Sequence, residues 1–422
     1  MSDRDLDVVV FGATGVTGRR VAAYLAERSS ETGMSWAPAA RDAAKLDRML
    51  SEDGVDTEEF VTAELGDAAS LAGMAGRAKV VLDLVGPYTL YGRPVIEACI
   101  EGGAHYVDLT GEIPFVRTIA RELGPAAEEA GVKIVEVCGF EALPPDLMVL
   151  SAAETARERW DEPLLSAELE VWATPPPGVP RPSDVLSGGT IQSMAVVTGA
   201  EGAGAVTDPA ALIDDPKVAA QVRSRSPIEL APRRGLHGAV VAPMSPAAFI
   251  NPAVIHRTAE LAAAASGRAP QPFRYREGAA LQGSAVTLPL RYAVAGALSG
   301  MQAGMRTVAR SRPAIRRRAS EAMSSLLPSS GFGPRGDRVE GWRWGMELAA
   351  RTSGGHGLSV ELDADGHPGY LSTARMIGEA GLLLAEAGAT PDRAGCLTPA
   401  MALGTGALPR FERAGMRFRV TA

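Results

Sequence analysis

Residues 8–18 read VVVFGATGVTG, a run of β-branched residues that leads into three glycines. An alanine-rich segment of good helix formers follows and extends to about Arg28. Valine favours strands because its branched side chain packs well on a pleated surface, whereas glycine permits the tight turn that must follow. The stretch therefore predicts a buried strand, a turn and the start of a helix.

The glycines of this stretch are spaced G-x-x-G-x-x-G, a variant of the dinucleotide-binding fingerprint. Gly12 allows the turn, Gly15 would let the backbone approach a pyrophosphate, and Gly18 would let the helix pack closely on the strand. The first N–H groups of the helix then offer hydrogen bonds and a partial positive charge to phosphates. A turn with a purely structural role is the alternative. The expected cofactor contacts are Gly12, Ala13, Thr14, Gly15, Val16, Thr17 and Gly18.

The end of the second expected strand, residues 34–40, is where such a domain selects between NAD and NADP. An acidic residue there accepts hydrogen bonds from the ribose hydroxyls of NAD, whereas an arginine pairs with the 2′-phosphate of NADP. Arg41 comes first, and Lys45 follows one helical turn later. Asp42 would fit NAD, but it fits equally well as the N-cap of the next helix. We expect Arg41 and Lys45 to bind NADP, with NAD the less favoured cofactor; a solvated helix start is the other interpretation.

A strongly apolar segment, residues 78–85, predicts a buried fourth strand that runs into Gly86 and Pro87. In a doubly wound sheet this strand end lies beside the nicotinamide end of the crevice. We therefore expect Gly86 and Pro87 to shape the backbone against the cofactor. Tyr88 and Tyr91 carry hydroxyl groups, and either could donate a proton to a substrate or simply pack within the loop.

The fifth expected strand, residues 105–109, ends in Thr110-Gly111-Glu112 at the same edge of the sheet. We expect Gly111 to contact the cofactor there. Asp108 and Glu112 are candidates for a carboxylate near the substrate, although Glu112 could instead cap the helix that follows. The three cysteines are far apart and show no metal-ligand spacing, so no metal site is predicted.

Strands and helices alternate over about the first 140 residues, which predicts a parallel sheet with helices on both faces. We therefore predict an α/β fold: a Rossmann doubly wound sheet in residues 1–143, then a second, mixed α/β domain in residues 144–365. Residues 366–422 are predicted as a C-terminal helical segment that packs back on the first two parts. Loops are expected at residues 186–194 and 326–337.

The composition is that of a globular protein, with 422 residues of which 46% are hydrophobic and 22% charged. A formal net charge of −8 argues against a general nucleic-acid-binding function. The few cysteines fit a reducing interior, and the sequence shows no signal peptide and no uninterrupted apolar stretch of about 18 residues. We expect a cytoplasmic protein.

The segment 278–320 has an unusual charge pattern, because it contains no acidic residue. Residues 286–305 are mostly apolar, with Arg291 among them, and six arginines follow at positions 306–318. This pattern suits peripheral contact with a membrane or lipid surface, and it equally suits the wall of a channel for a long acyl chain. A core or dimer-interface helix with a solvated basic end is the third interpretation, which makes a second copy of the chain a candidate partner.

Seven blocks of the sequence share their order with one known family. They are VVVFGATGVTGRRVAAYL, AARDAAKL, DLVGPYTLYGRPVIEACIEGGAHYVDLTGE, CGFEALPPDL, SGGTIQSM, GYLSTARM and TPAMALG. Together they resemble the saccharopine dehydrogenase-like oxidoreductases, and most of all their trans-acting enoyl reductase branch. The resemblance implies a Rossmann domain, NAD(P)H-dependent reduction and a second α/β domain that closes over the substrate. It supplies no acid–base residue, and residues 200–340 are its divergent part.

The leading hypothesis is an NADPH-dependent enoyl reductase that acts on a lipid or polyketide acyl intermediate, delivered by a synthase. Hydride transfer to the β-carbon would develop an enolate that a donor must protonate, and Tyr88 and Tyr91 are the candidates. A saccharopine-type amino acid dehydrogenase is one alternative. The arginines available to its carboxylates are Arg223, Arg225, Arg233 and Arg234. A non-catalytic NADP-binding protein of lipid surfaces is the other alternative.

Overall fold

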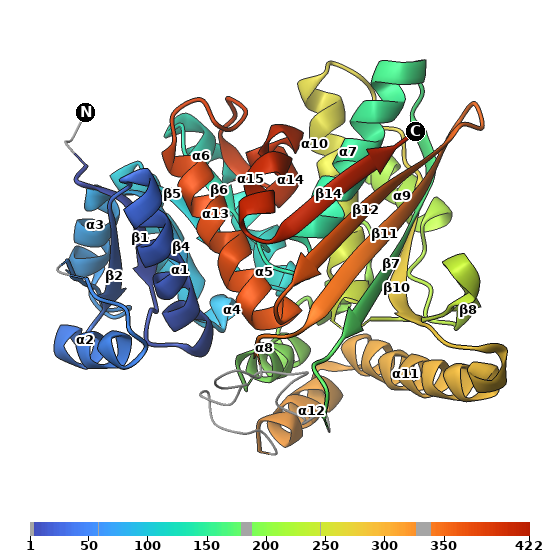
Figure 1. Cartoon of the computed structure of the whole chain (residues 1–422), viewed down its shortest axis with the longest axis horizontal. Helices are drawn as coiled ribbons and strands as arrows, with labels where there is room; N and C mark the ends of the chain where they lie inside the picture. The colour runs from blue at the N-terminus through green and yellow to red at the C-terminus, as the bar shows by residue number, and fades with distance from the viewer. Residues whose placement is uncertain (1–3, 58, 179–187, 245, 326–338) are drawn as a thin grey trace.

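The chain is built around two seven-stranded sheets, which lie side by side in Figure 1. The structure, a computed structural model, describes residues 4–57, 59–178, 188–244, 246–325 and 339–422. The loop expected at 326–337 lies outside these residues, as do the first two residues of the loop expected at 186–194. The rest of the latter prediction is wrong, because a helix already begins at residue 188.

The first sheet is entirely parallel, with the strand order β13-β6-β5-β4-β1-β2-β3. Its strands are β1 (Leu6–Phe11), β2 (Trp36–Ala40), β3 (Val61–Thr62), β4 (Ala78–Asp83), β5 (His105–Asp108), β6 (Lys133–Val135) and β13 (Gly395–Leu397). The helices between them are α1 (Val16–Thr32), α2 (Ala43–Glu52), α3 (Ala68–Arg77), α4 (Tyr88–Gly102), α5 (Ile113–Glu122) and α6 (Gly124–Glu129). The order of strands 1 to 6 is that of the Rossmann fold, so this prediction is confirmed.

The valine run forms β1 because both faces of this strand are covered by helices. Val8 and Val10 are fully buried in the core that contains α1 and the C-terminal helix α13 (Thr373–Ala385). Val9 and Phe11 point the other way, into the core that contains α3 and α4. A parallel strand buried on both faces needs apolar residues at every position rather than at alternate ones, which explains the continuous run.

The second sheet is mixed and has the order β14-β12-β11-β7-β10-β9-β8. Its strands are β7 (Leu164–Thr174), β8 (Arg233–Arg234), β9 (Val240–Ala242), β10 (Arg274–Leu281), β11 (Arg343–Thr352), β12 (Gly357–Asp365) and β14 (Met416–Thr421). Only β7 and β10 pair in parallel. Helix α7 (Leu143–Trp160) packs on β7, β11 and β12, and α10 (Asn251–Ala265) packs on α7. The prediction of a second, mixed α/β unit is confirmed.

The remaining helices surround the space between the sheets or close the chain. They are α8 (Gly188–Gly199), α9 (Pro216–Arg225), α11 (Leu288–Ala309), α12 (Pro313–Ser325), α14 (Pro399–Leu403) and α15 (Leu408–Arg413), with the short turns η2 (Ala203–Thr207), η3 (Leu236–Gly238), η4 (Ala247–Phe249), η5 (Ala285–Thr287), η7 (Pro368–Ser372) and η8 (Thr405–Ala407).

The C-terminal segment, expected to be helical, also contains two strands. Its strand β13 extends the first sheet beside β6, and its strand β14 extends the second sheet beside β12. Helix α13 packs on α1, β1, β4 and β5. Strand β13 has three residues and β14 has six, and each pairs with a strand that is distant in the sequence. Their local sequences are therefore too short to predict a strand from the pattern of apolar residues.

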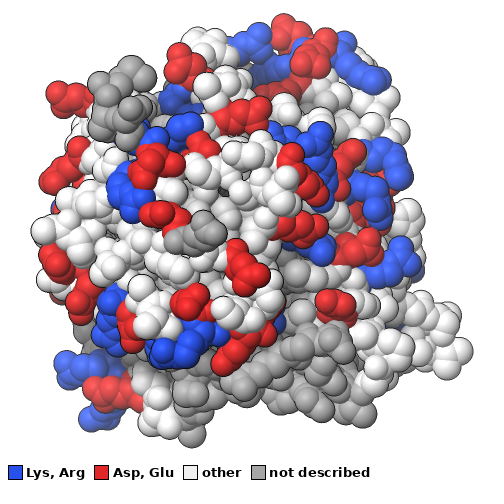
Figure 2. Space-filling view, turned by 60° about the vertical axis from the view of Figure 1, so that its left-hand side comes forward, with Lys and Arg blue, Asp and Glu red and all other residues white. Residues whose placement is uncertain are grey.

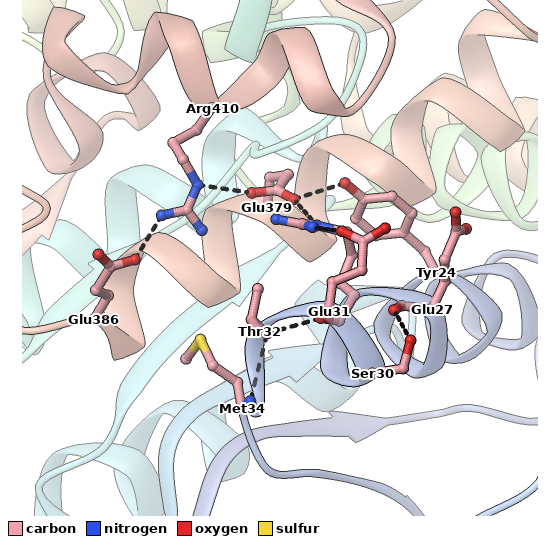
Figure 3. Close-up of polar contacts among 10 residues, drawn as sticks. Tyr24, Glu27, Ser30, Glu31, Thr32, Met34, Glu379, Glu386 and Arg410 are labelled. Carbon is pink, nitrogen blue, oxygen red and sulfur yellow. Dashed lines mark hydrogen bonds and ion pairs between the residues drawn. The ribbon is translucent and has the colours of Figure 1, made fainter.

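A buried ionic network fastens α13 to α1 (Figure 3). The Glu379 carboxylate accepts hydrogen bonds of 2.7 Å from both the Tyr24 hydroxyl and Arg28 Nε. Glu379 is fully buried and Arg28 is 3% exposed. On the other side Arg410 Nε of α15 lies 3.4 Å from Glu379, and its Nη1 donates to Glu386 at 2.5 Å. The network therefore ties the first helix of the chain to two of its last helices.

The surface of the molecule carries both signs of charge. On the face shown in Figure 2, Lys and Arg side chains lie interspersed with Asp and Glu side chains rather than in one large basic or acidic area.

Candidate cofactor and substrate site

A cavity of about 1420 Å³ opens at the carboxyl ends of the first sheet's strands. Pockets for drug-sized ligands hold about 300–1,000 Å³, so this cavity has room for a dinucleotide and a second ligand. The loops that follow the strands of the first sheet supply one wall. Its residues are Gly12, Thr14, Gly15, Val16, Thr17, Gly18, Gly86, Tyr88, Leu109, Thr110, Gly111, Glu112, Val137, Gly139 and Glu141. Among the residues expected to bind the cofactor or to donate a proton, five do not line the cavity: Ala13, Arg41, Lys45, Pro87 and Tyr91.

Two of the fingerprint glycines occupy positions that no other residue fits. Gly12 has a φ of +87°, and a Cβ there would lie 2.7 Å from Val85 Cγ2. A Cβ on Gly18 would lie 2.3 Å from the carbonyl oxygen of Gly12, because helix and strand backbones almost touch. These are the turn and the close packing that the spacing predicts for a dinucleotide site.

Gly15 is different, because it leaves room rather than relieving a clash. Its φ is −74°, and a Cβ would meet only the Gly12 carbonyl oxygen at 3.4 Å. Gly15 is the N-cap of α1, and no side chain caps this end of the helix. The first turn of α1 therefore presents its N–H groups to the cavity, with no Cβ at Gly15 to keep a phosphate away. The residues present fit the pyrophosphate of a dinucleotide.

At the end of β2, where the adenosine side of the cofactor is expected, Arg41 forms no ion pair with any described residue. The Asp42 carboxylate accepts a 2.9 Å hydrogen bond from the Lys45 backbone N–H, so it is the N-cap of α2, as the sequence indicated. Arg41 and Lys45 are exposed. With its carboxylate held by the helix, Asp42 is less available to ribose hydroxyls than Arg41 is to a phosphate.

Two buried carboxyl groups hold the strand-end loops at the nicotinamide end. Asp83 accepts a 2.9 Å hydrogen bond from the Val85 N–H, and Asp108 accepts bonds of 3.0 Å from the N–H groups of Thr110 and Val137. The Tyr106 hydroxyl lies 3.1 Å from Asp83 and 3.0 Å from Asp108. Burial raises the pKa of Asp83 and raises the pKa of Asp108 to about 7. Asp108, expected near the substrate, therefore acts as a fully buried support of the cavity wall.

Glu112 lines the cavity but caps a different helix from the one expected. Its carboxylate accepts hydrogen bonds from the N–H groups of Tyr88 (3.0 Å) and Thr89 (2.8 Å), and from the Thr89 hydroxyl. These are the first residues of α4, whereas no side chain caps α5, the helix that follows Glu112. Glu112 thus fixes the loop after β4 against the loop after β5.

The two tyrosines expected to donate a proton lie in different surroundings. Tyr88 lines the cavity wall, and its hydroxyl donates to the Asp83 carbonyl oxygen at 3.1 Å and accepts from the Leu109 N–H at 3.4 Å. Burial raises the pKa of Tyr88 well above its ordinary value. Tyr91 is 39% exposed and lies outside the cavity lining, so its side chain is not brought to this site.

A half-buried carboxyl group that we did not predict lines the cavity at Glu141. It follows β6, and burial raises its pKa. The rule that pointed to the loops after β4 and β5 applies to this loop as well, so position at the carboxyl edge of the sheet could have identified it. Val137, in the same loop, has a φ of +62°, a strained value for a β-branched residue.

Other lining residues come from distant parts of the chain. Ser193 of α8 reaches the loop after β4, since its Oγ lies 3.9 Å from the place of a Cβ on Gly86. Thr373, the first residue of α13, accepts a 3.4 Å hydrogen bond from the Phe140 N–H, next to Glu141. No local sequence signal could have placed either residue here, because tertiary packing alone brings them to the first sheet.

The wall opposite the cofactor loops is largely apolar. It is formed by α8, η2, the turn at η4, and the helices α11 and α12. Its apolar residues are Met194, Val197, Ala203, Val206, Pro246, Phe249, Ile250, Met305, Val308, Ala309, Ala319 and Met323. This part of the cavity suits a hydrophobic ligand.

The arginines considered for a substrate carboxylate are engaged elsewhere. Arg223 pairs with Asp208 at 2.8 Å, Arg225 donates to the Pro272 carbonyl oxygen, and Arg233 pairs with Glu168 at 2.7 Å. Arg234 is exposed, and none of the four lines the cavity. In the described part of the chain, no group of three His, Cys, Asp or Glu residues is placed to hold a metal ion.

Comparison with known proteins gives the site its context. Residues 8–135 match the family described as saccharopine dehydrogenase NADP binding domain. A provisionally named trans-acting enoyl reductase of Mycobacterium tuberculosis is 32% identical, over 99% of this chain and 98% of its own length. Trans-acting enoyl reductases of Mycobacterium bovis and Mycobacterium ulcerans are each 30% identical, over 98% of this chain and 97% of their own. Saccharopine dehydrogenase (L-Glu forming) from Saccharomyces cerevisiae aligns over 98% of this chain and 99% of its own with a TM-score of 0.49 and 13% identity.

The family match over residues 8–135 includes the glycine turn. The relatives at 30% and 32% identity align over nearly the whole chain, and so over both of its sheets and not the first alone. The chain therefore belongs to the saccharopine dehydrogenase-like oxidoreductases, in their trans-acting enoyl reductase branch, and it is an NADP-dependent oxidoreductase.

Proposed function

We propose that this protein uses NADPH to reduce the carbon–carbon double bond of an unsaturated lipid or polyketide acyl chain held as a thioester. The observation that carries the proposal is the continuity of one cavity, from the glycine turn to a wall of apolar side chains on α8, α11 and α12. The names of the curated relatives support the same reaction.

A preference for NADPH over NADH is expected from the end of β2. Replacing Arg41 with alanine removes the exposed cation and leaves the Asp42 cap in place. Because a hydrogen bond to a charged group contributes about 1.5–3 kcal/mol, NADPH affinity should fall about ten- to hundredfold. NADH affinity should stay the same. Nicotinamide fluorescence titrations with both cofactors measure this.

Arg48→Ala is the matched control, because Arg48 is also exposed on α2 but lies beyond its first turn. It should leave both affinities unchanged. Equal losses for NADPH and NADH in Arg41→Ala, or a wild-type preference for NADH, would contradict the assignment.

The proton required by the reaction has a candidate source in Glu141. When bound, NADPH supplies the hydride that reaches the β-carbon of the acyl chain. The α-carbon then needs a proton, and Glu141 is a half-buried carboxyl group at the cavity wall. Since burial raises its pKa, Glu141 stays protonated to a higher pH than an ordinary glutamate. The Tyr88 hydroxyl is already bonded to backbone groups on both sides.

Replacing Glu141 with glutamine should lower kcat about 10²- to 10⁴-fold, the usual contribution of a positioned acid, with little change in NADPH affinity. In the wild type, kcat should fall as pH rises through the raised pKa of Glu141, because the protonated form is the donor. The variant should lose this dependence on pH. Tyr88→Phe is the comparison: a large loss of kcat in this variant, with Glu141→Gln unaffected, would transfer the role to Tyr88.

The reaction itself is tested by following NADPH oxidation with saturated and α,β-unsaturated acyl thioesters of increasing chain length. Turnover should require the double bond and should rise with chain length as the apolar wall is filled. Binding of NADPH without oxidation by any unsaturated thioester would rule the proposal out. Oxidation with a keto acid and an amine would instead favour the amino acid dehydrogenase.

A further inference from the structure

Helix α11 turns its polar residues toward the protein. Arg291 is only 7% exposed and donates hydrogen bonds to the carbonyl oxygens of Gly238, Leu281 and Ser284 at 3.0–3.2 Å. Gln302 is fully buried and donates to the Pro243 carbonyl oxygen at 2.9 Å. The long polar side chains of the first five turns are therefore used to hold α11 against the edge of the second sheet.

The outward side of the same helix is apolar. Leu290 is 65% exposed, Val294 42% and Met301 52%, and no charged residue lies between Arg291 and Arg306. Small or apolar residues fill the rest of the exposed side, namely Pro289, Tyr292, Ala293, Gly296, Ala297, Gly300 and Gly304. A helix at a protein–water boundary shows the opposite arrangement, with its apolar stripe inward. The outward side of α11 is thus suited to an apolar environment.

Helix α12 adds positive charge beside this surface. Arg312, just before α12, and Arg317 and Arg318 within it are exposed, and no described residue forms an ion pair with them. The sequence holds no acidic residue in 278–320, and α12 contains one, the exposed Glu321, so the surface keeps an excess of positive charge. In Figure 1, α11, α12 and α8 lie together along the lower edge of the molecule. An apolar helix beside unpaired arginines complements a surface that is apolar inside and anionic at its rim.

The same two helices form part of the cavity wall. Met305 and Val308 of α11 and Met323 of α12 line it, beyond the exposed part of α11. A surface that touched the outward side of α11 would therefore lie next to the apolar end of the cavity.

We propose that α11 and α12 dock this protein on an anionic phospholipid bilayer. The outward side of α11 enters the interface between headgroups and acyl chains, and Arg312, Arg317 and Arg318 contact the lipid phosphates. The protein lies on the bilayer and does not span it; among the described helices none has the length and hydropathy to do so. Contact with a second copy is disfavoured, because the three exposed arginines outnumber the single acidic residue of α12, Glu321, and two such surfaces would repel each other. Resting on the proposed function, this places the apolar end of the cavity where an acyl chain can enter from the membrane.

Vesicle co-sedimentation of the full chain, without substrate, tests the docking. The probes are vesicles of equal parts phosphatidylcholine and phosphatidylglycerol, and vesicles of phosphatidylcholine alone. The wild type should bind the anionic vesicles, and the charge variant should bind at least about tenfold more weakly, since each basic residue near an anionic surface contributes about a fivefold gain. The charge variant carries Arg312→Gln, Arg317→Gln and Arg318→Gln; its control carries Arg351→Gln, Arg413→Gln and Arg417→Gln.

The apolar variant separates insertion from electrostatic adsorption. It carries Leu290→Gln, Val294→Gln and Met301→Gln; its control carries Leu165→Gln and Val420→Gln, exposed apolar residues elsewhere. The apolar variant should lose at least about tenfold in vesicle binding, because inserted methylene groups each contribute to the affinity, and the control should not. All variants should keep the wild-type rate on a short water-soluble enoyl thioester, since none of these residues lines the cavity.

Three results would overturn the proposal. The first is that the wild type does not bind anionic vesicles. The second is that the charge variant loses vesicle binding whereas the apolar variant keeps it. The third is that light scattering shows a wild-type dimer, that the apolar variant is a monomer, and that neither protein binds vesicles. Each can occur with enoyl reductase activity intact, and docking can equally persist in a protein that reduces no enoyl thioester. Failure of the docking and failure of the proposed function are therefore distinguishable.

Discussion

Replacing Gly18 with alanine is expected to abolish NADPH binding and to destabilise the fold, whereas replacing Gly15 with alanine is expected to abolish binding alone. A Cβ on Gly18 would lie 2.3 Å from the Gly12 carbonyl oxygen and 2.8 Å from Ala13 Cα. Both neighbours are backbone atoms of the turn, so either helix α1 or the turn must move. Overpacking of this kind costs about 1–3 kcal/mol, and here the moved backbone is the binding site itself.

Gly15→Ala meets only the Gly12 carbonyl oxygen at 3.4 Å and needs no unusual φ, so the free energy of unfolding should change by less than about 0.5 kcal/mol. The added methyl group points into the cavity at the first turn of α1. It should weaken NADPH binding by about two orders of magnitude, since several charge-assisted hydrogen bonds lengthen together.

Fluorescence titration with NADPH and denaturant unfolding of both variants measure these effects. Gly66→Ala is the matched control, because a Cβ there has no neighbour within 4 Å; it should change neither quantity. Normal NADPH affinity in Gly15→Ala would mean that the pyrophosphate does not lie at the start of α1. Unchanged stability in Gly18→Ala would mean that the helix–strand approach is looser than described.

The second large effect concerns the buried carboxylate that fastens α13 to α1. Glu379→Ala should lower the free energy of unfolding by about 3–5 kcal/mol, the cost of leaving a buried charge without its partner. Arg28, at 3% exposure, loses the acceptor of its Nε and keeps only the half-exposed Glu31 as a partner, and the Tyr24 hydroxyl loses its acceptor as well. Denaturant unfolding measures the change.

Glu386→Ala removes a carboxylate from the same network at an exposed position, so it should cost no more than about 1 kcal/mol. The double variant Arg28→Met, Glu379→Leu should recover most of the loss, since apolar residues of similar size can replace a buried ion pair. A loss below about 1 kcal/mol in Glu379→Ala would show that water or a neighbouring cation compensates the site.

The sequence was most informative where structure is local. The valine run, the glycine spacing and the Asp42 cap all concern contacts within a few residues, and each expectation agrees with the structure. A strand that is buried on both faces, and the helix that follows it, each have a pattern of apolar residues within one short segment. Such a pattern can be recognised without knowing the contacts between distant segments. The strand, the glycine turn and the helix start at the candidate site were therefore predictable from the sequence.

The rest of the candidate site depends on contacts between distant segments. The sequence shows Arg291 within an apolar run but not that it faces inward, because a helix apolar all round gives no preferred side. Tyr91 looked equivalent to Tyr88, but in the structure Tyr91 is 39% exposed and Tyr88 only 6%. Thr373 reaches the cavity from a segment more than 230 residues beyond Phe140, its hydrogen-bond partner. The positions of these side chains depend on how distant segments pack against one another. The periodicity of apolar residues in a single sequence does not predict that packing.

The return of the C-terminal segment to the first sheet has a consequence for biosynthesis. A chain emerging from the ribosome completes β1 to β6 early, but the core beside Val8 and Val10 stays uncovered until α13 has been made. Strand β13 must then pair beside β6, once residues 395–397 have been made. Until these segments exist, the nascent N-terminal domain exposes apolar surface, and chaperones act on such surfaces. Ribosomes stalled before residue 373 would display it in a form that proteases cut readily.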